Sequence, residues 1–132
     1  MIFVDSNIPM YLVGAPHRHK EDAKRALERL IGESARLVTD VEVIQEILHR
    51  YGAIGRRDAI EPCIDTLLSL TDEIFPVDLD DVLEARDQMA GPAGISARDA
   101  IHIAVMRRHE VGTILSFDSG FDAVESVRRI TA

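Results

Sequence analysis

Short apolar runs alternate with amphipathic segments along most of this chain. Ile2–Val4 is an uninterrupted run of β-forming residues, as expected for a strand that is buried on both faces of a parallel sheet. A short helix is expected next, and a second helix is expected over 17–31, where apolar residues recur at helical spacing and Gly32 marks the end. Strands that alternate with helices in this way form βα units, so we predict a three-layer α/β/α sandwich with a central, mostly parallel sheet of four to five strands. The other strands are expected at 37–39, 74–77, 113–117 and 127–131.

The length and composition predict one domain that covers residues 1–132. A chain of 132 residues with 46% hydrophobic residues can fill a single core. Cys63 is the only cysteine, which excludes an intrachain disulfide and a cysteine-based zinc site and favours a reducing cytoplasm. Asp5 interrupts the first apolar run, and no segment reaches the roughly 20 apolar residues of a membrane span. We therefore expect a soluble cytoplasmic protein that does not act at a membrane.

The net charge at first opposes binding to nucleic acid. There are 15 Lys and Arg residues against 23 Asp and Glu residues, a net charge of −8, whereas nonspecific phosphate binding needs a basic surface. Bound metal would neutralise several acids, however, and local basic patches can bind phosphate on an acidic protein. Each basic cluster taken alone is more simply explained as a solvated helix face. The clusters are His17–Lys20 with Lys24, Arg25 and Arg29, then Arg56–Arg57, Arg107–Arg108 and Arg128–Arg129.

Asp5 directly follows the first predicted strand. Ligands of open α/β sheets bind in the crevice outside the carboxyl ends of the strands, so this position predicts a functional acid. The structural alternative is that Asp-Ser-Asn provides helix-capping chemistry, with Ser6 or Asn7 as the cap of the next helix. Ser6 and Asn7 could instead orient Asp5.

Glu46 lies in the helix predicted after Asp40, which can cap it. It borders the apolar stripe that includes Val43 and Ile47, whereas Glu42 lies nearer the helix start and its favourable dipole. We therefore expect Glu46 to be the acid that faces the crevice.

The carboxyl-terminal third supplies three more acids and a histidine. Asp118 ends the strand predicted at 113–117, and Asp122 falls one turn later as a cap or supporting acid. Asp99 lies three residues after Ser96, which is capping-box spacing, yet the small residues around it would also permit close approach to a bound ion. His102, one turn after Asp99, is interpreted as a hydrogen-bonded, half-buried histidine and not as a ligand.

Carboxylates that share one crevice repel each other, and the natural counter-charge is a divalent cation. Mg²⁺ or Mn²⁺ suits a few carboxylates better than zinc, which favours sites rich in histidine. Such ions promote phosphodiester hydrolysis because they activate water and offset the charge on the phosphate. The acids therefore point to a metal-dependent nuclease.

Four motifs in this order resemble the PIN-domain family, and within it the VapC-type toxins of toxin–antitoxin pairs, over essentially the whole chain. They are Val-Asp-Ser-Asn at Asp5, Val-Ile-Gln-Glu-Ile at Glu46, Arg-Asp-Ala-Ile-His-Ile-Ala at Asp99, and Ser-Phe-Asp at Asp118 with Asp122.

The resemblance implies an α/β/α fold and an endoribonuclease that requires Mg²⁺ or Mn²⁺. Asp5, Glu46, Asp99 and Asp118 would then be the catalytic metal ligands, with water as the nucleophile and a 5′-phosphate product. It also implies an RNA substrate such as transfer or ribosomal RNA, a small antitoxin that covers the acidic crevice, and a homodimer. The supporting polar residues would be Ser6, Asn7, Thr39 and Asp122.

Two other enzyme classes and one binding function compete with this interpretation. A haloacid-dehalogenase-like phosphatase needs a second acid two residues after Asp5, where this chain has Asn7, and a response-regulator receiver needs an acidic pair that is also missing. The remaining alternative is a non-catalytic PIN-like module that binds RNA or serves assembly. The presence of all four acids argues against that alternative.

Overall fold

The computed structural model describes residues 1–131 and contains one fully parallel sheet of five strands. The strand order is β3-β2-β1-β4-β5, so β1 is central and the chain moves outward first to one side and then to the other. The order reverses beside β1, which is where open α/β sheets bind ligands. The strands are β1 (Ile2–Val4), β2 (Leu37–Asp40), β3 (Glu73–Phe75), β4 (Thr113–Leu115) and β5 (Arg128–Ile130).

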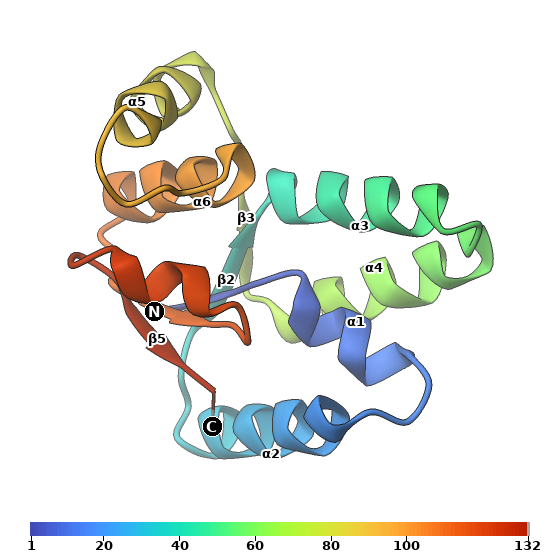
Figure 1. Ribbon diagram of the computed structural model, residues 1–132. Helices are drawn as coiled ribbons and strands as arrows, with labels where there is room; N and C mark the ends of the chain where they lie inside the picture. Colours follow the sequence, from blue (N-terminus) through green and yellow to red (C-terminus); the bar gives the residue numbers. More distant parts are fainter. Residues whose placement is uncertain (132) are drawn as a thin grey trace.

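Helices cover both faces of this sheet, which confirms the predicted three-layer α/β/α architecture. In Figure 1, α5 and α6 lie above the sheet and α2 lies below it, while α3 and α4 project together to the right. The helices are α1 (Asn7–Val13), α2 (Arg18–Gly32), α3 (Val41–Ala53), α4 (Ile60–Leu70), α5 (Leu79–Met89) and α6 (Ala97–Arg108), with 3₁₀ turns η1 (Arg57–Ala59) and η2 (Ser119–Ala123).

The core lies on both faces of the central strands. Phe3, Val4, Val38, Ile114 and Leu115 are all fully buried, as the uninterrupted apolar runs predict. Among residues 1–131, no helix is both long enough and apolar enough to cross a membrane.

Side-chain caps fix the starts of four helices, one of which is α2, where the His17 ring accepts a hydrogen bond from the His19 backbone N–H. Asp40, Asp78 and Ser96 each accept a hydrogen bond from a backbone N–H in the first turn of α3, α5 and α6, respectively. The prediction that Ser6 or Asn7 caps the helix after β1 is wrong, because α1 has no side-chain cap. Both side chains instead bond to residues that are distant in the sequence.

Candidate metal centre

Asp5 lies at the carboxyl end of β1, buried and held by neighbouring donors. Its Oδ1 accepts a hydrogen bond from the backbone N–H of Ser6 at 2.8 Å. Its Oδ2 accepts bonds from the Ser116 hydroxyl at 2.6 Å and from the Asn7 amide at 3.4 Å. Burial raises the pKa of Asp5 and outweighs the bond from Ser116 and the nearby His102, which act in the opposite direction. The hydrogen bonds from Ser6, Ser116 and Asn7 fix the orientation of this carboxylate.

Ser116 connects the acids of β1 and β4. Its hydroxyl donates to Asp5, and the same oxygen accepts bonds from the Asn7 amide at 3.2 Å and the Asp118 backbone N–H at 3.0 Å. These contacts use the single donor and both lone pairs of the hydroxyl, so its proton must point at Asp5. The sequence analysis assigned no role to Ser116. The available signal was a polar residue inside an otherwise apolar run, two residues before an acid.

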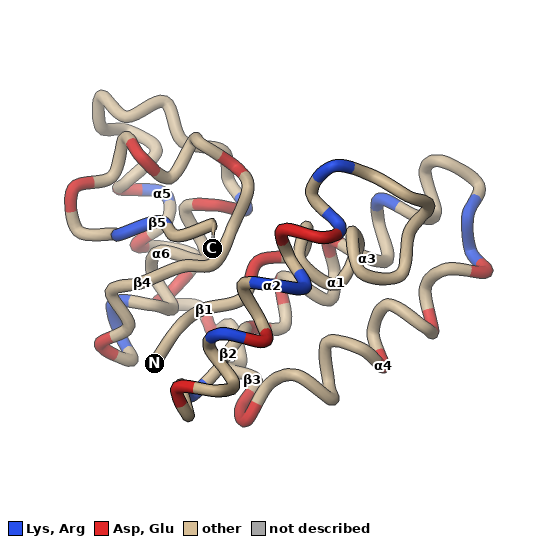
Figure 2. The backbone as a smooth tube through the Cα atoms, turned by 90° about the horizontal axis from the view of Figure 1, so that it is seen from below, with Lys and Arg blue, Asp and Glu red and all other residues tan. Residues whose placement is uncertain are grey.

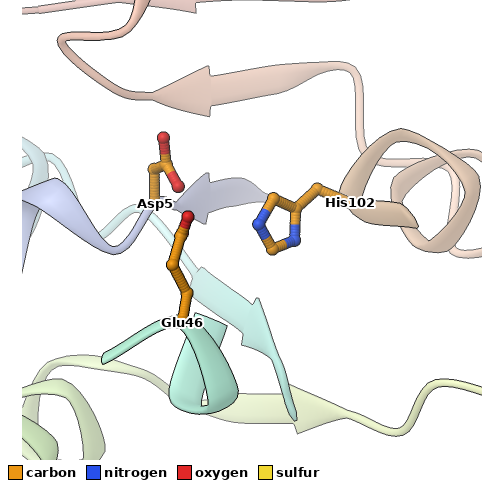
Figure 3. A group of neighbouring side chains, drawn as sticks. All are labelled: Asp5, Glu46 and His102. Atoms are coloured by element: carbon orange, nitrogen blue, oxygen red, sulfur yellow. The ribbon is translucent and has the colours of Figure 1, made fainter. Parts of the chain in front are cut away.

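Glu46 extends from α3 toward Asp5. Its Oε1 accepts a hydrogen bond from the Ser6 hydroxyl at 2.6 Å. Ligand atoms of Asp5, Glu46 and His102 all lie within 4.8 Å of one another, and Figure 3 shows the three side chains converging from separate elements. Glu42 lies 4.0 Å from the guanidinium of Arg98. Burial raises the pKa of Glu42, and His102, Asp40 and Glu46 are among the charges that act on it. The structure thus brings Glu46 to the carboxyl end of β1, as we expected.

His102 is fully buried on α6, not half-buried as expected. Its Nδ1 lies 2.8 Å from Oδ2 of Asp40, so the expectation of a hydrogen-bonded histidine is confirmed. Burial lowers the pKa of His102, but Asp40 and then Asp5 and Glu46 raise it to about 9. Within residues 1–131, Nε2 of His102 is buried and has no hydrogen-bond partner.

Asp99 and Asp118 belong to the same electrostatic environment. Burial raises the pKa of Asp99 to about 6, and repulsion from Asp5 and from Asp118 adds to this effect, while His102 opposes it. Glu46 in turn raises the pKa of Asp5. The four acids are therefore linked in one series, from Glu46 through Asp5 and Asp99 to Asp118.

The last two predicted supporting residues face other partners. Asp122 forms a two-pronged ion pair with Arg129, at 2.8 Å to Nε and 2.9 Å to Nη2. Arg129 also donates to the Ser116 carbonyl at 3.2 Å, so this arginine connects Asp122 to the backbone of Ser116. Thr39 is buried and donates to the Val4 carbonyl at 2.9 Å, next to Asp5. Their support of the site remains a prediction.

This donor set fits a divalent cation. Carboxylates held close together raise each other's pKa, and a cation among them would relieve that repulsion. Carboxylate oxygens are the preferred ligands of Mg²⁺ and Mn²⁺.

Comparisons with known proteins identify the family that this chain matches. The model of the PIN domain family matches residues 2–127. Ribonuclease VapC13 of Mycobacterium tuberculosis is 53% identical over 130 residues, which cover 98% of this chain and 99% of the relative.

Solved structures show the same fold at lower sequence identity. The crystal structure of VapC20 of Mycobacterium tuberculosis, a toxin that cleaves the sarcin-ricin loop, gives a TM-score of 0.78 at 24% identity and covers 97% of this chain and 99% of that one. A chain in a toxin–antitoxin complex from Klebsiella pneumoniae gives a TM-score of 0.67 at 16% identity, with coverage of 97% and 96%.

Proposed function

The chain belongs to the PIN-domain family, and on this basis we propose that it is a metal-dependent endoribonuclease and the toxin of a toxin–antitoxin pair. The observation that carries the proposal is the electrostatic series of Glu46, Asp5, Asp99 and Asp118 at the carboxyl end of the sheet. The ribonuclease that is 53% identical supports the activity.

The four acids would hold Mg²⁺ or Mn²⁺ beside the scissile phosphate. When bound, the cation supplies an activated water and offsets the negative charge of the phosphate and the leaving oxygen. Ser116 and Ser6 keep Asp5 and Glu46 oriented through bonds of 2.6 Å each. Asp99, with a pKa of about 6, is ionised at neutral pH and can orient the attacking water. We expect a product with a 5′-phosphate.

RNA would reach the acids through local basic and aromatic side chains. Figure 2 shows Lys and Arg interspersed with Asp and Glu around α2, with further Lys and Arg at the turn between α3 and α4. One hollow is lined by Arg18, His19, Asp22, Phe117, Arg129 and Thr131. A second hollow is lined in part by Asn7, Tyr11, His17, Arg50 and Tyr51.

Arg18 and Arg50 in these hollows offer guanidinium groups to phosphates, and the aromatic side chains offer ring faces to bases. Single-stranded nucleic acid binds to this combination of groups. Transfer RNA and ribosomal RNA are the substrate classes to test first, by mapping RNA ends after controlled expression in a bacterial host.

We also propose a small antitoxin that covers the acidic crevice, a homodimer and a cytoplasmic location. Two observations support the antitoxin: the resemblance to VapC-type toxins, and the fold that this chain shares with a chain in a toxin–antitoxin complex. Exposed apolar residues on α5, namely Leu79, Val82, Leu83 and Met89, offer a surface for a second copy. Light scattering of the purified chain, alone and with its antitoxin, tests both assemblies, and a lone monomer in each case would contradict them.

Cleavage of structured RNA by the purified protein tests the activity directly. We expect cutting with Mg²⁺ or Mn²⁺ and none with a chelator. A non-catalytic RNA-binding module would instead hold RNA equally well in chelator and would leave it intact with metal present.

A further inference from the structure

His102 is a histidine that lies close to the acids of the candidate metal centre. It is fully buried, and its Nε2 has no hydrogen-bond partner anywhere in residues 1–131. Buried polar atoms without a partner are uncommon and need a reason, because they give up their bonds to water without replacement. Figure 3 shows the imidazole ring turned toward the carboxylates of Asp5 and Glu46.

Asp40 fixes the ring in this orientation. Its Oδ2 lies 2.8 Å from Nδ1 of His102, and its Oδ1 accepts the cap bond from the Val43 backbone N–H at 3.0 Å. The ring of Phe3 packs on the imidazole with its centroid 5.2 Å away. Histidines that bind metals usually engage a carboxylate in this way with one nitrogen and offer the other nitrogen to the metal.

The neighbours of the His102 ring are themselves ligand groups. A ligand atom from each of Asp5, Glu46 and His102 lies within 4.8 Å of the other two, close enough for one ion to contact all three. The three side chains come from β1, α3 and α6, elements that are held together by the core.

We propose that His102 binds the metal ion through a ring nitrogen and joins Asp5 and Glu46 in a mixed imidazole–carboxylate site. The ion would displace the proton of Nε2, because only a neutral imidazole nitrogen can bind a metal. The inference rests on the proposed function, which requires a divalent cation at these acids. Imidazole suits divalent transition metals, whereas Mg²⁺ strongly favours oxygen ligands. The site should therefore prefer Mn²⁺ to Mg²⁺, and Asp40 acts as the positioning residue for His102.

Pulsed electron paramagnetic resonance of the full chain loaded with Mn²⁺ reads this ligand directly. We expect modulation from an imidazole ¹⁴N nucleus in the unmodified protein, loss of that signal in His102→Gln, and no change in His49→Gln, a histidine exposed on α3. The spectrum of the unmodified protein decides the matter even if His102→Gln fails to fold.

Metal affinity provides a second readout that does not depend on cleavage. Asp40→Asn keeps a residue that can cap α3 but weakens the acceptor for His102, so Mn²⁺ affinity should fall about tenfold or more. Mg²⁺ affinity, measured by competition with Mn²⁺, should fall less.

The possible outcomes distinguish the role of His102 from the presence of a metal site. Bound Mn²⁺ without ¹⁴N coupling would overturn the role of His102 and leave the carboxylate site and the proposed function in place. A chain that binds neither Mn²⁺ nor Mg²⁺ would overturn the metal site of the proposed function as well.

Discussion

The two sides of the candidate metal centre differ in how well their polar side chains are satisfied by hydrogen bonds. On the side of β1 and β4, Ser116 uses its donor and both lone pairs to connect Asp5, Asn7 and Asp118. On the side of α6, the pKa of Asp99 is raised to about 6 by burial and repulsion, and Nε2 of His102 has no partner in residues 1–131.

This difference shows which groups the protein satisfies by itself. The β1 and β4 side is preorganised by hydrogen bonds, whereas the α6 side carries charges and a buried nitrogen that a divalent cation would stabilise. Groups with perturbed pKa values gathered in one crevice, here Asp5, Asp99 and His102, are typical of functional sites, where stability is traded for activity.

The largest effect is expected from neutralising an acid on either side. Asp5→Asn and Asp99→Asn should each lower the rate of RNA cleavage by more than about 100-fold. A loss of up to about 100-fold is typical when the group removed only orients a metal ligand. The measurement is the cleavage rate of a structured RNA with Mn²⁺, with circular dichroism to confirm folding. Asp65→Asn, an exposed acid on α4, is the matched control. Full activity in both site variants would remove the proposed centre.

A smaller loss should follow when the preorganised side is loosened. Ser116→Ala removes the bond of 2.6 Å to Asp5, so cleavage should fall by about 10- to 100-fold while Mn²⁺ remains bound. Ser69→Ala, which removes an exposed hydroxyl on α4, should leave the rate unchanged. Equal rates for the two serine variants would show that the Ser116 network does not matter for catalysis.

On the α6 side, the raised pKa of Asp99 predicts how the stability of the metal-free protein depends on pH. The pKa of Asp99 is about 6 in the folded chain and near 3.8 when unfolded, so the folded state binds this proton more tightly. Metal-free protein therefore gains stability from Asp99 as pH falls from 6 toward 3.8, and loses it as pH rises through 6. Asp99→Asn should raise the melting temperature by a few degrees at pH 7.5, with the difference shrinking toward pH 4.

Thermal melts of the two proteins in chelator, compared at each pH, measure this difference. With metal present at pH 7.5, the unmodified protein should instead melt at the higher temperature, because the metal stabilises the chain that retains Asp99. A melting difference that does not vary with pH would contradict the assigned pKa.

The smallest effect is expected for Asp122, which lies outside both sides. Its two oxygens bind Arg129, and this ion pair is exposed, so Asp122→Asn should lower the melting temperature slightly and less so at high salt. Calorimetric titration should show unchanged Mn²⁺ affinity. A large loss of affinity would instead place Asp122 among the ligands.

Local patterns in the sequence were sufficient to predict most of the fold. The strands end within two residues of their predicted positions, and the caps at Asp40 and Ser96 are confirmed, because each depends on neighbours within one turn. The apolar spacing also predicts a helix over 57–70. This segment begins instead as the 3₁₀ turn η1, and α4 starts at Ile60, which places Pro62 in a first turn where its missing N–H is tolerated.

Long-range pairing explains what the sequence analysis missed. The cap expected at Ser6 fails because its hydroxyl binds Glu46, 40 residues away. His102 is fully buried and pairs with Asp40 at the end of β2, 62 residues earlier. Such partners are set by the packing of α3 and α6 on the sheet, which no local pattern encodes.

Anomalous diffraction from crystals of the protein soaked in Mn²⁺ tests the central claim most directly. We expect a manganese peak within about 2.5 Å of carboxylate oxygens of Asp5 and Glu46. Bound manganese at other positions, with none at these two carboxylates, would contradict a metal centre at the carboxyl end of β1.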